Sequence, residues 1–218
     1  MNTTKKQPWP TKDAMDQVYK LKLWGSNSSE FYSGEGSHLP EIVDPYIDKV
    51  TLFLKSFETP FIVCDLGCGD FNIGKELIKH SKKYIAVDIV NDLIDYNKEK
   101  FKAENLEFQC LDIAKDDIRI GDCAIIRQVL QHLSNTEIKT ILNKLSDFKY
   151  VILTEHLPEG DFEPNKDIIS GQGIRLKKQS GVEITSPPFN LKVKEEKEIL
   201  SINLKNGKGI ITTKLYIL

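Results

Sequence analysis

The sequence has no long hydrophobic run and almost no net charge. Its 218 residues hold 30 Lys and Arg against 32 Asp and Glu, a formal charge of −2. No stretch approaches the ~20 apolar residues that a membrane-spanning helix needs. Proteins that mainly grip a nucleic-acid backbone are usually more basic. The first ten residues, Met1–Pro10, are polar and lack the apolar core of a secretion signal. We therefore expect a cytoplasmic protein with no membrane contact and with nucleic acid an unfavoured partner.

Cysteine is also scarce. Cys64, Cys68, Cys110 and Cys123 show no CxxC spacing, and no histidine stands near them at metal-ligand spacing. This pattern argues against a disulfide framework and against a zinc site. We expect reduced thiols beside the predicted strands and no bound metal.

Short apolar strands alternate with helical segments in the middle of the chain. The predicted strands are Phe61–Leu66, Tyr84–Asp88, Leu106–Cys110, Asp122–Ile126 and Tyr150–Thr154. The predicted helices are Pro40–Phe57, Ile73–Ser81, Asp92–Phe101 and Asn135–Ser146. Such alternation implies parallel strands joined by helical crossovers, with helices on both faces of the sheet.

The end of the chain changes character. Glu198–Leu204 and Ile210–Leu218 are rich in β-forming residues and flank an Asn206-Gly207 pair. Asn-Gly accepts the positive φ angles of a tight turn, so we expect an antiparallel hairpin to close the sheet.

Two segments lie outside this alternation. Leu21–Leu39 mixes aromatic residues with glycines and serines, which indicates an ordered loop rather than a linker. Glu155–Lys197 is rich in Pro and Gly, and a connection of that length is usually functional. We predict one domain at residues 40–218 with an insertion at about 155–197. Residues 1–39 form an N-terminal extension that can act as a lid over a site.

The strongest motif follows the first predicted strand. Asp65 is followed by Gly67 and Gly69 in a Gly-x-Gly turn, with Asp70 directly after it. Glycines let a ligand approach the backbone, and ligands bind at the carboxyl ends of such strands. A dinucleotide site normally uses G-x-G-x-x-G to hold a pyrophosphate at a helix N-terminus. Two carboxylates beside the turn oppose a pyrophosphate and suit a ligand with an ammonium group and a sulfonium.

The stretch Asp65–Gly69 resembles motif I (D/E-x-G-x-G) of the class I S-adenosylmethionine-dependent methyltransferases. The family often has a third glycine where this chain has Phe71. The resemblance extends over about residues 41–218. It implies an α/β Rossmann-like fold: a mostly parallel seven-stranded sheet, helices on both faces and a C-terminal antiparallel hairpin. It also implies S-adenosyl-L-methionine as cofactor and methyl transfer as the reaction.

The resemblance assigns roles along the chain. Asp88 ends the second strand, where the family binds the ribose hydroxyls, and a carboxylate can accept from both of them. Asp112 follows the third strand, where the family contacts the adenine amine, although Asp116 and Asp117 are close enough to be confused with it. The predicted cofactor-binding residues are Tyr32, Ser37, Asp65, Gly67, Gly69, Asp88, Ile89, Asp112, Ile113, Arg127 and Gln128. Ile89 and Ile113 are equally consistent with a place in the core.

The fourth strand runs into Arg127–Leu133, which stands where the family places residues beside the methyl group. His132 is a candidate base because its unperturbed pKa of ~6.5 is near working pH. Glu155 and His156, after the fifth strand, form a second candidate acid–base pair. Gln131 and Arg175 are predicted to contact the acceptor. Structural roles stay open for His132 and Glu155.

These residues predict O-methylation of a small hydroxylated acceptor, such as a sugar or polysaccharide precursor. Three alternatives stay open: an NAD-linked oxidoreductase, a nucleic-acid or protein methyltransferase, and a noncatalytic cofactor-binding module. The missing third glycine counts against the first. The absence of a D/N-P-P-Y motif after the fourth strand argues against amino-methylating DNA enzymes, and no paired His/Asp metal set is present. The sequence carries no signal of oligomeric state.

Overall fold

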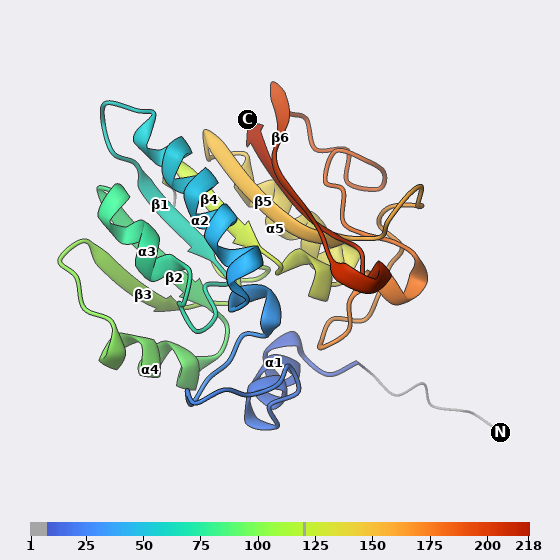
Figure 1. Cartoon of the computed structure of the whole chain (residues 1–218), viewed down its shortest axis with the longest axis horizontal. Helices are drawn as coiled ribbons and strands as arrows, with labels where there is room; N and C mark the ends of the chain where they lie inside the picture. The colour runs from blue at the N-terminus through green and yellow to red at the C-terminus, as the bar shows by residue number, and fades with distance from the viewer. Residues whose placement is uncertain (1–7, 120) are drawn as a thin grey trace.

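A computed structural model describes residues 8–119 and 121–218, which form one seven-stranded sheet with helices around it (Figure 1). The strands are β1 Ile62–Leu66, β2 Lys83–Asp88, β3 Leu106–Cys110, β4 Cys123–Arg127, β5 Tyr150–Leu157, β6 Glu195–Asn203 and β7 Ile210–Ile217. The helices are α1 Thr11–Lys20, α2 Pro40–Lys55, α3 Gly74–Leu77, α4 Asn91–Lys100 and α5 Asn135–Leu145. Short 3-10 turns are η1 Glu35–Ser37, η2 Ile78–His80, η3 Leu130–His132, η4 Arg175–Lys178 and η5 Lys205–Gly207. None of the helices in these described ranges is long and apolar enough to cross a membrane.

The strand order is β3-β2-β1-β4-β5-β7-β6. β1 to β5 run parallel to one another, and β7 is antiparallel to both β5 and β6. The predicted fold is therefore confirmed. The chain leaves β1 toward β2 on one side and returns to β4 on the other. This reversal opens a crevice beyond the carboxyl ends of β1 and β4.

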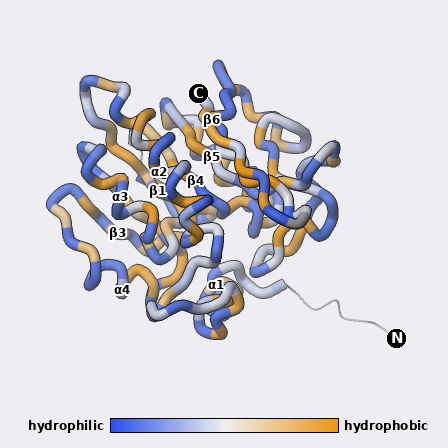
Figure 2. The backbone as a smooth tube through the Cα atoms, viewed as in Figure 1, coloured by the Kyte–Doolittle hydropathy of each residue, from blue (hydrophilic) through white to orange (hydrophobic). Residues whose placement is uncertain are grey.

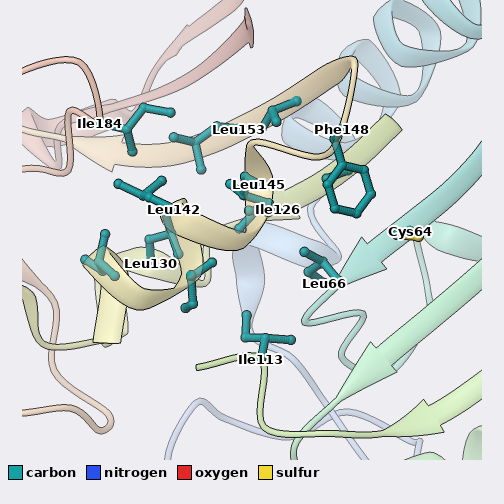
Figure 3. Close-up of a cluster of buried hydrophobic side chains, with 14 of the residues drawn as sticks. Cys64, Leu66, Ile113, Ile126, Leu130, Leu142, Leu145, Phe148, Leu153 and Ile184 are labelled. Atoms are coloured by element: carbon teal, nitrogen blue, oxygen red, sulfur yellow. The ribbon is translucent and has the colours of Figure 1, made fainter. Parts of the chain in front are cut away.

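Alternate residues of each central strand face opposite layers of helix. Val63 and Ile125 pack in the layer that contains α2. Cys64, Ile126 and Leu153 pack on the other side, under α5, with Ile126 and Leu153 visible in Figure 3. Figure 2 shows hydrophobic residues along these central strands and many hydrophilic ones in the outer loops. Both faces of the parallel strands are thus buried, as expected for a sheet with two helical layers.

The C-terminal hairpin is present, but its connection is longer than a two-residue turn. Leu204 N donates to Gly209 O across the connection, and η5 occupies the middle of it. Gly207 and Gly209 both have positive φ angles, +66° and +97°. A side chain at Gly209 would meet the Leu157 carbonyl oxygen and the His156 ring, so this position packs against the end of β5.

The segment predicted as one helix at Ile73–Ser81 is shorter and irregular. The helical part is α3, followed by the tighter η2. Phe71, at the place of the family's third glycine, adopts a left-handed conformation with φ +61°. Its buried ring lies so close to Gly74 that a Cβ there would collide with it. α3 therefore begins at Gly74, where the absence of a side chain leaves room for the Phe71 ring.

Residues 8–20, which the sequence analysis treats only as a polar extension, contain a helix. In α1, Thr11, Met15 and Val18 are buried at spacings of four and three, the pattern of one helical face. Met15 and Val18 pack against Val90 and Leu93 next to β2 and in α4. In Figure 1, α1 lies beyond the ends of the strands, outside both helical layers.

The segment between β5 and β6 is irregular but tightly organised around Asn165. This buried residue has φ +61°, and its N–H donates to Gly181 O at 2.8 Å. Its amide group donates to Glu183 O at 2.8 Å and Pro187 O at 2.9 Å, and accepts from Glu183 N at 2.8 Å. One buried side chain thus supplies hydrogen-bond partners for backbone groups of an irregular segment that has no β-sheet pairing.

Candidate active site

A cavity of about 460 Å³ opens at the carboxyl ends of β1, β2 and β4, where the sheet topology predicts a ligand. Its size falls in the range of roughly 300–1,000 Å³ that is typical of small-molecule sites. The predicted residues that border it are Ser37, Asp65, Gly67, Gly69, Asp88, Ile89, Asp112, Ile113, Arg127, Gln128, Gln131 and His132. Four predicted residues, Tyr32, Glu155, His156 and Arg175, do not border it.

The glycine turn after β1 forms one wall. Gly67 and Gly69 have φ angles of +90° and +57°, a region that residues with a Cβ enter at a cost. A Cβ at Gly67 would collide with the Val129 side chain, and one at Gly69 would collide with the Ser33 hydroxyl. The turn needs both glycines because neighbouring segments lie directly against its backbone.

Asp65 lies in β1 and is buried, with Tyr84 Oη donating to its Oδ2 at 2.9 Å. Burial raises its pKa to about 7, and the Tyr84 bond opposes that rise. A positively charged ligand close to Asp65 would favour the ionised form of this carboxyl group. Asp65 is thus suited to stabilise a cationic group inside the cavity.

Asp88 closes the other side of the glycine turn. Its Oδ2 accepts from Gly69 N at 3.0 Å and its Oδ1 accepts from Val90 N at 3.1 Å. Each oxygen has a further lone pair for a ligand hydroxyl. Burial raises the pKa of Asp88, and these backbone donors counteract the rise.

The Asp88→Ala substitution is expected to weaken binding of S-adenosylhomocysteine by about 1–3 kcal/mol, because two carboxylate acceptors are lost. Isothermal calorimetry measures this directly. The matched control is Asp95→Ala on the exposed side of α4, which should leave the affinity unchanged. Equal affinity of Asp88→Ala and the parent protein would remove Asp88 from the binding site.

Part of the cavity wall comes from the segments that follow β2 and β3. Ile89 and Ile113 stand on it, beside Asp112. The Asp112 carboxylate accepts from Ala114 N at 3.0 Å and pairs with Lys115 at 2.9 Å. Asp116, the competing acid in the sequence, does not border the cavity and accepts instead from Asp112 N. Asp112 is therefore the acid that a planar ligand between the two isoleucines would meet.

Arg127 joins the end of β4 to the N-terminal segment. Its guanidinium donates to Gly36 O at 2.5 Å, Ser37 Oγ at 3.3 Å and Gln128 Oε1 at 3.0 Å. It also lies over the Tyr46 ring, 4.9 Å from the centroid. Arg127 Nε and the Tyr46 hydroxyl are buried without a hydrogen-bond partner in the described structure. Both residues border the cavity, but these two atoms are themselves closed off from it.

Residues 31–38 cross the cavity and are held to the glycine motif. Ser33 N donates to Asp70 Oδ2 at 2.9 Å, and Asp70 N donates back to Ser33 Oγ at 2.8 Å. Tyr19 Oη lies 3.0 Å from the same Ser33 hydroxyl, and His38 Nε2 lies 2.5 Å from Asp70 Oδ2. Tyr32 packs on the His38 ring outside the cavity, at 4.5 Å between centroids. This placement gives Tyr32 a contact with the crossing segment and none with the cavity.

His132 stands in η3 on the cavity wall. Its Nδ1 lies 3.2 Å from Gly171 O, and Gln131 Nε2 lies 3.3 Å from its Nε2. The Trp24 ring packs against it at 5.0 Å. Burial lowers the pKa of His132 to about 4, so the ring is neutral at pH 7 but its pKa lies further from working pH than the sequence predicted for a base.

Arg175, predicted to bind the acceptor, is only 1% exposed. Its donors reach the carbonyl oxygens of Leu130, Gln131, Leu133 and Lys166, and the Asn135 side chain. These bonds use all five guanidinium N–H groups. The side chain therefore holds the turn after β4 and has no donor left for an acceptor.

Glu155 and His156 belong to β5, which extends to Leu157, beyond the predicted Thr154. The His156 ring points to the hairpin, where its Nε2 lies 2.6 Å from Lys208 O. Glu155 is 3% exposed, and neither of its carboxylate oxygens has a hydrogen-bond partner among the residues that the structure describes. Burial raises the pKa of Glu155 to about 8, with Arg175 and the backbone of η3 opposing the rise.

Glu155 should make stability depend on pH. A carboxyl whose folded pKa is raised contributes stability that is full below its ordinary pKa of 4.5 and is lost as pH rises toward about 8. The free energy of unfolding should fall in that window by at most about 1.4 kcal/mol per pH unit. Glu155→Gln, of the same shape, should flatten the profile and be the more stable protein at pH 9. Denaturant unfolding at pH 5, 7 and 9 measures this, and parallel profiles for the two proteins would contradict it.

The class of protein follows from this arrangement. A Rossmann-like sheet, a D-x-G-x-G turn, an acid after β2 and a cavity at the switch point are the features expected of a class I methyltransferase. Comparison with known proteins agrees, because residues 63–148 match the family profile described as a methyltransferase domain. Residues 63–148 are thus similar to a methyltransferase domain, in agreement with the resemblance seen in the sequence.

Solved structures show the same fold over most of the chain. The N-methyltransferase NodS from Bradyrhizobium japonicum, with S-adenosyl-L-homocysteine, superposes with a TM-score of 0.67 at 12% identity, covering 94% of this chain and 98% of that one. Magnesium protoporphyrin IX methyltransferase (ChlM) from Synechocystis PCC 6803, with bound S-adenosylmethionine, superposes with a TM-score of 0.59 at 14% identity, covering 98% and 99%. At such identities these likenesses show the fold.

One curated relative is malonyl-[acyl-carrier protein] O-methyltransferase from Acetivibrio thermocellus, 26% identical over 100 residues, which are 45% of this chain. The aligned part spans about a third (34%) of that relative's length.

The cavity fits the family's cofactor, S-adenosyl-L-methionine. The glycine turn leaves backbone bare at the wall, Asp65 favours a cation, and Asp88 has free lone pairs at the cavity. These groups match a molecule that carries a sulfonium and a ribose.

Within the N-terminal extension, the sequence predicted a lid but named only Tyr32 and Ser37 as ligand-binding residues, so it missed α1 and several residues of the lid. Those that border the cavity are Thr11, Met15, Tyr19, Trp24, Ser33, Gly34, Glu35 and Gly36. The spacing of Met15 and Val18 could have predicted a helix, but it could not have predicted that this helix borders the cavity. Gln172 and Ile174, from the 155–197 segment, also border the cavity.

Proposed function

We propose that this protein is an S-adenosylmethionine-dependent methyltransferase that O-methylates a small hydroxylated acceptor, such as a sugar or polysaccharide precursor. The observation that carries the proposal is that the glycine turn and His132 border the same cavity. The bound cofactor supplies an electrophilic methyl group on sulfur. The chain has to place an acceptor oxygen on the axis of that bond and to remove a proton from it.

Positioning is the main task of the protein in such a displacement. Holding two reactants in line can supply roughly 7–11 kcal/mol of the barrier. Asp65 in β1, Asp88 at the end of β2 and Asp112 after β3 all border the cavity. These acids would hold the charged and hydroxylated parts of the cofactor, while His132 Nε2 would accept the proton of the acceptor hydroxyl.

Residues 21–39 act in this proposal as a lid. They are joined to the glycine motif through Ser33 and Asp70 and to β4 through Arg127. Gln172 Nε2 donates to Leu23 O at 3.0 Å, which links the lid to the 155–197 segment on the other rim. A cover of this kind excludes water and fixes the acceptor.

The charges around the cavity favour an acceptor without a phosphate. Among the described residues that border it, Arg127 is the one Lys or Arg, and its guanidinium already binds Gly36 O, Ser37 and Gln128. Several carboxylates face the same space, including Glu35 and Glu137. Arg175, which could have paired with an anionic acceptor, is buried elsewhere. An uncharged hydroxylated compound is therefore the better fit.

Calorimetry with S-adenosylhomocysteine, S-adenosylmethionine and NAD tests the cofactor. Micromolar binding of the first two without NAD binding is expected. Binding of NAD alone would overturn the proposal in favour of an oxidoreductase. The acceptor is tested next by release of S-adenosylhomocysteine in the presence of neutral sugars, their phosphorylated forms, a peptide and an RNA oligonucleotide.

Turnover with the neutral sugars supports the acceptor class. Turnover with the peptide or RNA alone replaces it with a macromolecular acceptor, and binding without any turnover indicates a noncatalytic module. The cytoplasmic location and the absence of a nucleic-acid partner stay predictions of the sequence.

A further inference from the structure

Tyr84 is a buried tyrosine of β2 whose hydroxyl bonds to the first acid of the glycine motif. Its register partner in β1 is Val63, so Tyr84 lies on the sheet face that also carries Asp65, two residues further along β1. Tyr84 Oη donates to Asp65 Oδ2 at 2.9 Å. Among the residues that the structure describes, this is the one hydrogen bond to the Asp65 side chain. It engages one carboxylate oxygen and leaves the other without a donor.

The Tyr84 ring is held in turn by Phe71, which stands at the place of the family's third glycine. The two rings meet edge to face, 5.8 Å apart between centroids, and both are fully buried. Phe71 also packs against two further phenylalanine rings, at 4.8 and 5.2 Å. A Cβ at Gly74 would collide with the Phe71 ring and lie 3.0 Å from Asp65 Oδ2, so no side chain fits between them. This packing keeps the hydroxyl beside Asp65.

The second oxygen of Asp65, Oδ1, is available to a ligand. Asp65 borders the cavity. Oδ1 has no donor among the described residues, yet unlike the Tyr46 hydroxyl it is not closed off from solvent. A carboxylate oxygen has two lone pairs, so Oδ1 can accept from N–H groups of a ligand while Oδ2 stays bonded to Tyr84.

The strand order indicates which part of the cofactor meets Asp65. Asp112 follows β3, Asp88 ends β2 and Asp65 lies in β1, and these three strands are neighbours in the sheet. Neighbouring strands are ~4.8 Å apart, so the three acids stand in a row. With the adenine at Asp112 and the ribose at Asp88, the amino acid end of the cofactor reaches Asp65. That end carries an ammonium group, which is a cation with three N–H donors.

We propose that Tyr84 is a positioning residue for the cofactor: its hydroxyl holds Asp65 Oδ2, so that Oδ1 and the negative charge of Asp65 serve the ammonium group. The proposal rests on the proposed placement of S-adenosylmethionine in this cavity. The bond has a second effect, because a hydroxyl that donates to a carboxylate favours its ionised form. Burial raises the pKa of Asp65 to about 7, and Tyr84 opposes that rise. Tyr84 thus increases the fraction of Asp65 that is charged at neutral pH.

Tyr84→Phe tests this role, because it removes the hydroxyl and keeps the ring. The measurement is the calorimetric affinity for S-adenosylhomocysteine between pH 6 and 8.5. In the parent protein the affinity should rise about tenfold over this range as Asp65 ionises. Without the Tyr84 bond the pKa of Asp65 should rise by about one unit. The affinity of Tyr84→Phe should then be about tenfold below the parent at pH 6 and within about twofold of it at pH 8.5.

Other groups near Asp65 stay in place in this variant. The titratable and charged groups around it are Asp88 of β2, Tyr46 of α2, Arg127 of β4, and Cys64 and Cys68 beside it in the chain. Asp88 is the other carboxyl among them, and 5′-methylthioadenosine controls for it. That compound has the adenosine half of the cofactor and no ammonium group, so its affinity should have the same pH dependence in the parent and in Tyr84→Phe.

Two further variants complete the design. Tyr216→Phe, a buried tyrosine of β7 that does not border the cavity, is the matched control and should reproduce the parent curve. Asp65→Asn can keep the bond to Tyr84 but carries no charge. Its affinity for S-adenosylhomocysteine should stay at the parent's pH 6 level throughout the range, which tests the charge of Asp65 even if Tyr84→Phe does not fold.

A shift of the affinity curve to higher pH in Tyr84→Phe alone supports the proposal. Identical curves for Tyr84→Phe and the parent, or a loss of affinity that is equal at every pH, overturn it. An Asp65→Asn curve that still rises like the parent's also overturns it. The ligand-free protein separates this inference from the cofactor proposal, because ¹³C NMR of the Asp65 carboxyl carbon, assigned with Asp65→Asn, gives its pKa directly. An unchanged pKa in Tyr84→Phe refutes the role of the hydroxyl, whereas a parent protein that binds S-adenosylhomocysteine at no pH refutes the cofactor placement.

Discussion

Gly67→Ala is expected to abolish detectable binding of S-adenosylhomocysteine and to lower the free energy of unfolding by about 2–4 kcal/mol. Two effects add at this position. A left-handed conformation at φ +90° costs an L-residue roughly 1–2 kcal/mol. The new Cβ would also meet the Val129 side chain on the turn after β4. Relief of that collision moves the glycine turn away from Asp88, whose carboxylate orders it.

Calorimetry and thermal unfolding measure the two losses separately. The control is Gly173→Ala, a glycine that does not border the cavity, because a Cβ there meets no atom of the described residues within 4 Å. That variant should bind the cofactor product as the parent does. If Gly67→Ala binds with parental affinity, the turn after β1 is not the cofactor wall that the packing indicates.

His132→Asn is expected to lower turnover by about 10²–10⁴-fold, the usual contribution of a general base. The amide nitrogen of Asn can still donate to Gly171 O, so the turn should keep its shape. What is lost is the lone pair at Nε2. Calorimetry with S-adenosylhomocysteine should give an unchanged dissociation constant, which separates loss of chemistry from loss of binding.

The rate is measured as S-adenosylhomocysteine release on any acceptor that the parent protein methylates. A drop of less than tenfold would mean that the acceptor loses its proton to water or to another group. Tenfold weaker cofactor binding would instead show that the ring is a structural part of the cavity wall.

Local patterns were enough for the sheet and for the glycine turn. Strands β1 to β5 are short apolar runs bounded by polar residues, and the hairpin is marked by Asn206-Gly207. Asp65, Gly67, Gly69 and Asp88 stand at the ends of strands whose direction is set by the crossovers. Parallel strands necessarily bring those ends together at one edge, so spacing along the chain predicted proximity in space.

The side chains after β5 were not open to the same reasoning. Glu155 and His156 seemed to face the crevice because β5 was predicted to stop at Thr154, and a strand three residues longer directs them elsewhere. Arg175 has the charge of an acceptor ligand, but its partners are backbone carbonyls 42–45 residues earlier in the chain. No local pattern reports which distant carbonyl oxygens a guanidinium will satisfy.

The sequence by itself determined the alternation of strands and helices and the place of the glycine turn, because each depends on periodicity or on a short local motif. The class of domain followed from the resemblance that this motif carries. Only the tertiary structure decided that α1 borders the cavity, and that Arg175 binds the turn after β4 instead of an acceptor. Those outcomes depend on contacts between segments far apart in the chain. Such contacts are selected by packing and by the need to pair every buried polar group, and neither is visible in a local stretch of residues.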